Sequence, residues 1–266
     1  MTRITIPSSV ITIRDNAFYN CTGLTNVTFG NGVTTIGSLA FSMCGSLTNI
    51  AMPNSLTNIK SSAFSYCNNL ATVTLPNSLI TIEGAAFAHC PSLAKITIPN
   101  SVARIEDGAF SFCTSLTNIA VGPLNAAYSG LAGVLFDKST NTLIQCPGGK
   151  AGSYTIPNSV TNIGTSAFVE CTSLTNTTVS TSVTSIGGNA FRNCTGLTSA
   201  TIGSSVTSIG DSAFFYGCTG IFRGILMGWN GAGVSLTAGR RELGLKARRP
   251  ARFSSRGHAF GFTKQG

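Results

Sequence analysis

The sequence has very few charged side chains and almost no histidine. Only 9% of its 266 residues are Asp, Glu, Lys or Arg, and the two histidines, His89 and His258, are far apart in the chain. Catalysis needs converging groups, such as a nucleophile beside a base, paired carboxylates or a set of metal ligands. The sequence holds no Cys-x-x-Cys pair and no glycine-rich loop leading from a strand into a long helix. We therefore expect a protein that is not an enzyme and that has no cofactor or metal.

Long apolar runs are missing as well. Apolar residues make up 42% of the chain, but they occur in runs of only a few residues. A membrane-spanning helix needs about 20 consecutive apolar residues, and a signal peptide needs a basic start followed by an apolar stretch. We expect neither in this chain. Ser, Thr, Asn and Gly fill much of the remainder, so the exposed faces must be covered by small neutral groups.

The formal charge of +9 belongs almost entirely to the end of the chain. Residues 1–218 carry eight Lys or Arg against seven Asp or Glu, whereas residues 219–266 carry nine against one. We interpret residues 219–266 as a basic, Gly/Arg-rich, non-repeat tail that is disordered. The alternative is an electrostatic arm for an anionic polymer, so nucleic acid is expected as a partner only through the tail.

The dominant positive feature is a repeat of 23 residues. An Ala-Phe pair recurs at that spacing, except for one interval of 58 residues between Phe110 and Phe168. The phenylalanines of the pairs are Phe18, Phe41, Phe64, Phe87, Phe110, Phe168, Phe191 and Phe214. A fixed period of this length is typical of a solenoid, which grows by adding coils along one axis. We therefore predict one elongated domain over residues 1–218.

Each repeat contains a strand signal followed by a compact apolar segment. Leu93, Ile96 and Ile98 illustrate the strand, in which apolar and polar residues alternate before a proline ends it. In the returning half, Ala40 and Cys44 are four residues apart, which would place them on one face of a short helical turn. The pattern thus predicts one short strand and one helical turn in every coil.

The nine cysteines follow the same period. Seven of them stand three residues after a repeat phenylalanine, Cys218 stands four after Phe214, and Cys146 stands apart. Free cysteine is among the most buried side chains and behaves as a small hydrophobe. We interpret the repeated cysteines as a column that faces the core.

The repeat resembles a leucine-rich repeat, and in particular the BspA-type unit S-V-x-x-I-G-x-x-A-F-x-x-C-x-x-L. Residues 159–174, from Ser159 to Leu174, match this unit position by position, and the resemblance covers roughly residues 2–218. It implies a β-rich α/β solenoid, a right-handed array of about eight to nine coils. It also implies a cell-surface or secreted protein that mediates attachment.

The spacing of 58 residues indicates an insert at about residues 122–152. Within it, residues 134–137 form a strand signal, residues 137–141 a polar turn and residues 143–146 a second strand that Pro147 ends. We expect a hairpin that projects from one coil and acts as a spacer.

Outward positions of the stacked strands form the candidate binding surface. Stacking repeats equivalent residues about every 4.8 Å. The candidate residues are short and neutral apart from one lysine: Thr25, Asn26, Thr28, Thr48, Asn49, Thr72, Thr74, Lys95, Thr97, Thr117 and Asn118. We expect a non-enzymatic module that binds a protein or glycan on a host or neighbouring cell. The alternatives are a structural fragment without a ligand, or a threonine ladder that binds ice.

Overall fold

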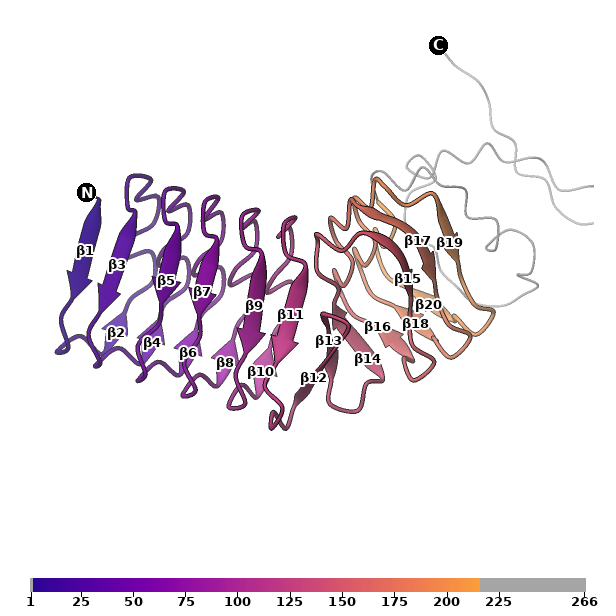
Figure 1. The fold of residues 1–266 in the computed structure, drawn as a ribbon, viewed down its shortest axis with the longest axis horizontal. Coiled ribbons are helices and arrows are strands. Elements are labelled where there is room, and N and C mark those ends of the chain that lie inside the picture. Colours follow the sequence, from indigo (N-terminus) through magenta and orange to yellow (C-terminus); the bar gives the residue numbers. More distant parts are fainter. Residues whose placement is uncertain (1, 216–266) are drawn as a thin grey trace, which may run out of the picture.

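A computed structural model describes residues 2–215, which form a solenoid of about nine turns (Figure 1). The basic tail inferred at residues 219–266, and Cys218 before it, lie outside the described residues. Each regular coil contributes one strand to a front face and one strand of two residues to a back face. The front and back strands follow one another along the array in chain order (Figure 1).

The first half of the array holds five complete pairs of front and back strands and one further front strand. The front strands are β1 (Arg3–Ile6), β3 (Asn26–Phe29), β5 (Asn49–Ala51), β7 (Thr72–Thr74), β9 (Lys95–Ile98) and β11 (Asn118–Val121). The back strands are β2 (Thr12–Ile13), β4 (Thr35–Ile36), β6 (Asn58–Ile59), β8 (Thr81–Ile82) and β10 (Arg104–Ile105).

An insert of three strands separates the halves, and three regular coils follow. The insert holds β12 (Tyr128–Leu131), β13 (Val134–Asp137) and β14 (Thr142–Gln145). The second half has front strands β15 (Gly152–Thr155), β17 (Leu174–Thr178) and β19 (Ser199–Thr201), and back strands β16 (Asn162–Ile163), β18 (Ser185–Ile186) and β20 (Ser208–Ile209).

The repeat period sets the register of the sheets. Where the strands of neighbouring regular coils pair, they are parallel, and in β9 and β11 each residue pairs with the residue 23 positions on, as Lys95 does with Asn118. Within β9, the side chains of Ile96 and Ile98 are buried while Lys95 and Thr97 are exposed. The predicted strands and their alternation are therefore confirmed for the front face, whereas the two-residue back strand of each coil was not predicted.

The predicted helical turns are wrong: residues 2–215 contain no helix, so the fold is a β-solenoid and not α/β. In the segment around Phe41, every second N–H group donates a hydrogen bond to the next coil. The N–H of Phe41, for example, donates to the carbonyl of Ala63 (2.8 Å). Leu39 and Met43 have positive φ values of 58° and 62°. An α-helix requires negative φ and bonds to the fourth preceding residue. The segment is instead a series of tight turns bonded to the adjacent coil.

Stacked phenylalanines fill the interior. The ring of Phe64 lies 5.2 Å from that of Phe41 and 5.4 Å from that of Phe87, nearly parallel in both cases. The second half repeats the arrangement, with Phe168 and Phe191 at 4.7 Å. Because these rings are fully buried, the column supplies much of the apolar area that each coil removes from water.

The insert lies within the array and does not project from it. Its strands β13 and β14 are close to the ones predicted, but β14 pairs in parallel with β16 and so takes the place of a back strand. On β13, Leu135 joins the core of the first half, while Val134 and Phe136 join the core of the second. The alternating sides of one strand thus connect the two halves.

The tyrosine of the insert also closes an open sheet edge. Strand β10 is the last of the five back strands of the first half. The N–H of Ile105 on β10 donates to the hydroxyl oxygen of Tyr128 (2.6 Å). The hydroxyl therefore replaces the backbone partner that a further back strand would supply.

The repeated cysteines face the core, as predicted. Cys44, Cys67, Cys90, Cys113, Cys171 and Cys194 are fully buried, and only Cys21, in the first coil, is half-buried. The thiol of Cys67 donates to the carbonyl of Phe41 in the preceding coil (3.2 Å). Similar bonds recur along the column, so the thiols satisfy turn carbonyls as well as filling space.

Alkaline pH should destabilise the array through these thiols. Burial raises the pKa of the Cys44 thiol from 9.0 to about 11. The stabilisation from keeping this thiol protonated is complete below its unfolded pKa and is lost as the pH rises through about 11. We expect the urea midpoint to fall between pH 9 and pH 11, and to fall less in Cys44→Ala. Equal losses in both proteins would contradict this assignment.

Candidate binding surface

All eleven residues predicted from the outward positions lie on the front face or directly before its strands. Ten are exposed and Asn26 is half-buried. The register aligns Asn49 with Thr72 and Ala51 with Thr74. It aligns Lys95 with Asn118 and Thr97 with Ala120. The structure therefore arranges the predicted residues in rows that cross neighbouring coils, with alanine interrupting the row of Thr74 and Thr97.

The residues of these rows differ in whether their side chains form hydrogen bonds within the protein. Thr25 donates its hydroxyl to the carbonyl of Thr2 (2.8 Å), and Thr117 donates to that of Ala94 (3.3 Å). These two threonines therefore help to join coils. By contrast, the side chains of Thr72, Thr74, Lys95 and Thr97 make no hydrogen bond within residues 2–215, which leaves them available to a partner.

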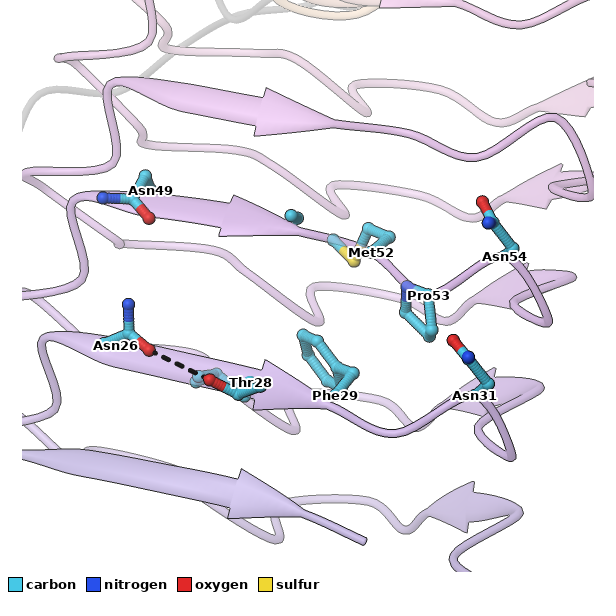
Figure 2. Close-up of a pocket in the computed structure, with 10 residues that line it drawn as sticks. Asn26, Thr28, Phe29, Asn31, Asn49, Met52, Pro53 and Asn54 are labelled. Atoms are coloured by element: carbon cyan, nitrogen blue, oxygen red, sulfur yellow. Dashed lines mark hydrogen bonds between the residues drawn. The ribbon is translucent and has the colours of Figure 1, made fainter. Parts of the chain in front are cut away.

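The front face is not one continuous ladder. Its first six strands are hydrogen-bonded two by two, as β1–β3, β5–β7 and β9–β11. A seam without strand pairing therefore runs between β3 and β5, and another between β7 and β9. At the first seam the surface is hollowed over about 380 Å³ (Figure 2).

The hollow, which we name the seam hollow, is lined by two successive coils. Asn26 and Asn49 lie at one end, and Asn31 and Asn54 at the other (Figure 2). Between them lie the side chains that form the floor, Phe29, Met52 and Pro53, and Val27, Thr28 and Ala51 also line the hollow. No charged side chain lines the hollow.

Sequence reasoning missed part of this site. It named Asn26, Thr28 and Asn49, but not Asn31, Asn54 or the apolar floor. A signal was present, because asparagine recurs at 23-residue spacing at Asn31, Asn54, Asn77 and Asn100. Turn chemistry explains asparagine at these positions without a ligand, so the recurrence alone does not indicate a site.

The back face carries a second hollow, of about 390 Å³, with charges at its rim. Arg14, Asp15 and Lys60 line it together with Thr12, Thr35 and Gly37. The carboxylate of Asp15 accepts a hydrogen bond from the N–H of Ser38 (2.7 Å). The ammonium of Lys60 binds Glu83 (2.7 Å), and that contact offsets the effect of burial and lowers the pKa of Glu83. These charges largely serve contacts between coils.

The histidine of the array lies in a stack of rings. His89 packs between Tyr66 and Phe112, with ring centroids 4.1 Å and 4.0 Å away. Burial lowers the pKa of His89, so the ring is neutral at physiological pH. No group of three or more His, Cys, Asp or Glu in residues 2–215 has the arrangement of a metal site. This ring stack is a packing feature of three coils.

Comparison with known proteins points to one repeat family. The BspA type leucine rich repeat region matches six copies in residues 1–120 and 148–222, on either side of the insert. The pneumococcal vaccine antigen PcpA is 31% identical, with a TM-score of 0.76 over 82% of this chain and 54% of that one. A leucine rich cell surface protein from Faecalibacterium prausnitzii is 35% identical, with a TM-score of 0.67 over 82% of this chain and 65% of that one.

A third solved structure supports the fold alone. A leucine-rich repeat protein from Eubacterium ventriosum has a TM-score of 0.69 at 22% identity, over 83% of this chain and 65% of that one. The chain thus spans between about half and two-thirds of the length of these three structures. A search of curated proteins gave no match. Within the described residues, no helix is long and apolar enough to cross a membrane.

Proposed function

The chain belongs to the BspA-type leucine-rich repeat family, and we propose that it is the binding module of a cell-surface or secreted protein that attaches to a protein or glycan on another cell. Neither the family nor the similar structures indicate an enzymatic activity, which supports a binding module. One of those structures is described as a cell surface protein and another as a vaccine antigen. Both descriptions support exposure of this chain outside the cell.

The observation that carries the proposal is the row arrangement on the front face. Four of its residues are exposed on neighbouring strands, and their side chains make no hydrogen bond within the described residues: Thr72, Thr74, Lys95 and Thr97. Threonine and lysine side chains give little affinity singly, since interface hot spots are mostly Trp, Tyr and Arg. An extended or repeated partner would gain avidity by engaging several coils at once.

The ice-binding alternative has less support. A flat, regular threonine ladder would have to continue from coil to coil. Here Ala51 and Ala120 interrupt one row, and strand pairing is interrupted at two seams. The front face therefore lacks the regular hydroxyl lattice that this function needs.

Replacing Thr72, Thr74 and Thr97 together with glutamate should reduce attachment about tenfold, the effect of losing roughly 1.4 kcal/mol of binding free energy. The change adds charge and bulk to a nearly neutral surface but touches no core residue, so the melting temperature should stay within a degree or two. The measurement is flow cytometry of beads coated with the full chain, mixed with epithelial cells and, separately, with bacteria.

A matched variant adds the same charge elsewhere. Thr12, Thr22 and Thr165 are exposed threonines outside the front strands. Their triple replacement with glutamate should leave attachment unchanged. If both triple variants lose attachment equally, net charge is responsible and the front face is not the binding surface. If neither variant loses it, the front face is likewise excluded.

A further inference from the structure

We propose that the seam hollow between β3 and β5 binds a ring of a neutral saccharide, an inference that rests on the proposed binding function and names the chemistry of one part of it. The hollow has a volume of about 380 Å³, within the range of about 300–1,000 Å³ that small-ligand sites occupy. It is shared by two coils, so its shape depends on their stacking and is formed before any ligand arrives.

The floor of the hollow matches the apolar face of a pyranose. Met52 and Pro53 are buried beneath the surface, while Phe29 is partly exposed. The ring of Phe29 contacts that of Phe41 edge to face, with centroids 6.1 Å apart, which fixes its orientation. A sugar ring presents C–H groups on its faces, and these pack well against such a rigid apolar floor.

The two ends of the hollow match the hydroxyl edges of the ring. Asn31 and Asn54 are exposed and their carboxamides make no hydrogen bond within residues 2–215. At the opposite end, Asn26 accepts a hydrogen bond from Thr28 (3.4 Å) and Asn49 donates one to Thr48 (3.2 Å), which leaves each amide further capacity. A carboxamide offers two donors and one acceptor oxygen, the combination that neighbouring hydroxyls require.

The backbone at the seam adds polar groups that the paired edges of the front strands lack. Because β3 and β5 are not hydrogen-bonded to each other, their facing edges do not satisfy one another. Backbone N–H and C=O groups that lack a partner strand in this way form hydrogen bonds with water or with a ligand. Hydroxyl groups, which donate and accept, can bond to both N–H and C=O along such an edge.

The charge and pattern of the lining favour a neutral sugar over other ligands. No Lys or Arg lines the hollow to bind a sialic acid, sulfate or phosphate group. Only the second and third coils carry asparagine at both ends. In the next two coils, Thr72 and Lys95 stand where Asn26 and Asn49 stand here. The site therefore accommodates one or two rings of a longer glycan.

A glycan array tests the proposal directly. The full chain is biotinylated, assembled on streptavidin to raise its avidity, and applied to printed neutral, sialylated and sulfated glycans. We expect binding to neutral glycans, and about tenfold weaker binding by N31A/N54A, since losing two polar contacts removes at least about 1.4 kcal/mol. The control is N68A/N77A, which removes two exposed asparagines outside the hollow.

Three results would overturn the inference: binding to no neutral glycan, binding to acidic glycans alone, or equal losses in the two double variants. Circular dichroism of both variants checks that the fold is intact. Attachment to cells separates the two proposals. If attachment remains sensitive to glutamate at Thr72, Thr74 and Thr97 but survives periodate oxidation of the cell glycans, the saccharide inference fails and the binding function stands.

Discussion

Replacing Phe87 with alanine should lower the free energy of unfolding by about 3–5 kcal/mol, the usual cost of deleting a buried aromatic ring together with the cavity that remains. The ring is fully buried. It stacks between Phe64 at 5.4 Å and Phe110 at 5.8 Å, so its loss exposes a gap to both neighbouring coils. Urea denaturation followed by circular dichroism measures the change.

Phe18→Ala provides the matched comparison. Its ring is only partly buried and stacks on one other repeat ring, that of Phe41, at 4.9 Å. We expect a smaller loss there, because fewer contacts disappear and the side chain is already partly hydrated. An unfolding free energy that falls equally in the two variants would contradict the view that stacking on both sides gives Phe87 its importance.

The regular part of the fold was predictable because each coil repeats the same physical requirement. Alternation of Ile96 and Ile98 with Lys95 and Thr97 fixes which face of a strand is buried, and a period of 23 residues fixes the register. The exposure of the candidate binding residues followed from the same alternation. None of this needed knowledge of contacts between particular coils.

The turns were not predictable by the same reasoning. Ala40 and Cys44 at i and i+4 fit a helical turn and a series of tight turns equally well. What decides between them is the hydrogen bonding of Phe41 to Ala63 in the next coil, together with positive φ at Leu39 and Met43. Neither residue is a glycine or an asparagine, although asparagine occupies the equivalent left-handed positions in the first coil, Asn16 and Asn20.

The seam hollow was missed for a related reason. A perfect repeat predicts the same pairing at every coil boundary, whereas β3 and β5 do not pair and β5 and β7 do. Phe29, Met52 and the equivalent residues of other coils are all apolar and differ only in size and shape. Their effect on strand pairing depends on packing in three dimensions, which the repeat pattern alone does not specify.

Asn125→Ala should also destabilise the protein by roughly 3–5 kcal/mol, through the insert and not through the apolar core. This side chain is 1% exposed, and all its polar capacity is used. Its amide nitrogen donates to the carbonyls of Pro99 (2.7 Å) and Val102 (3.0 Å). Its oxygen accepts from the N–H groups of Ala127 (2.8 Å) and Tyr128 (2.7 Å). Alanine would leave three main-chain groups without a partner, since the carbonyl of Pro99 also accepts from the N–H of Val102 (3.3 Å), and each buried group of this kind costs about 1–3 kcal/mol unless it finds another.

Two further variants separate the parts of this effect in urea denaturation. Asn125→Asp keeps an acceptor for the N–H groups of Ala127 and Tyr128 but cannot donate to Pro99 and Val102, so it should also destabilise. Asn69→Ala removes an exposed asparagine that donates to the carbonyl of Gly45 (2.7 Å), and it should cost less than about 1 kcal/mol because water replaces that bond. If Asn125→Ala were no more costly than Asn69→Ala, Asn125 would not anchor the insert. The burial of β13 alone would then have to hold Tyr128 in place at the edge of β10.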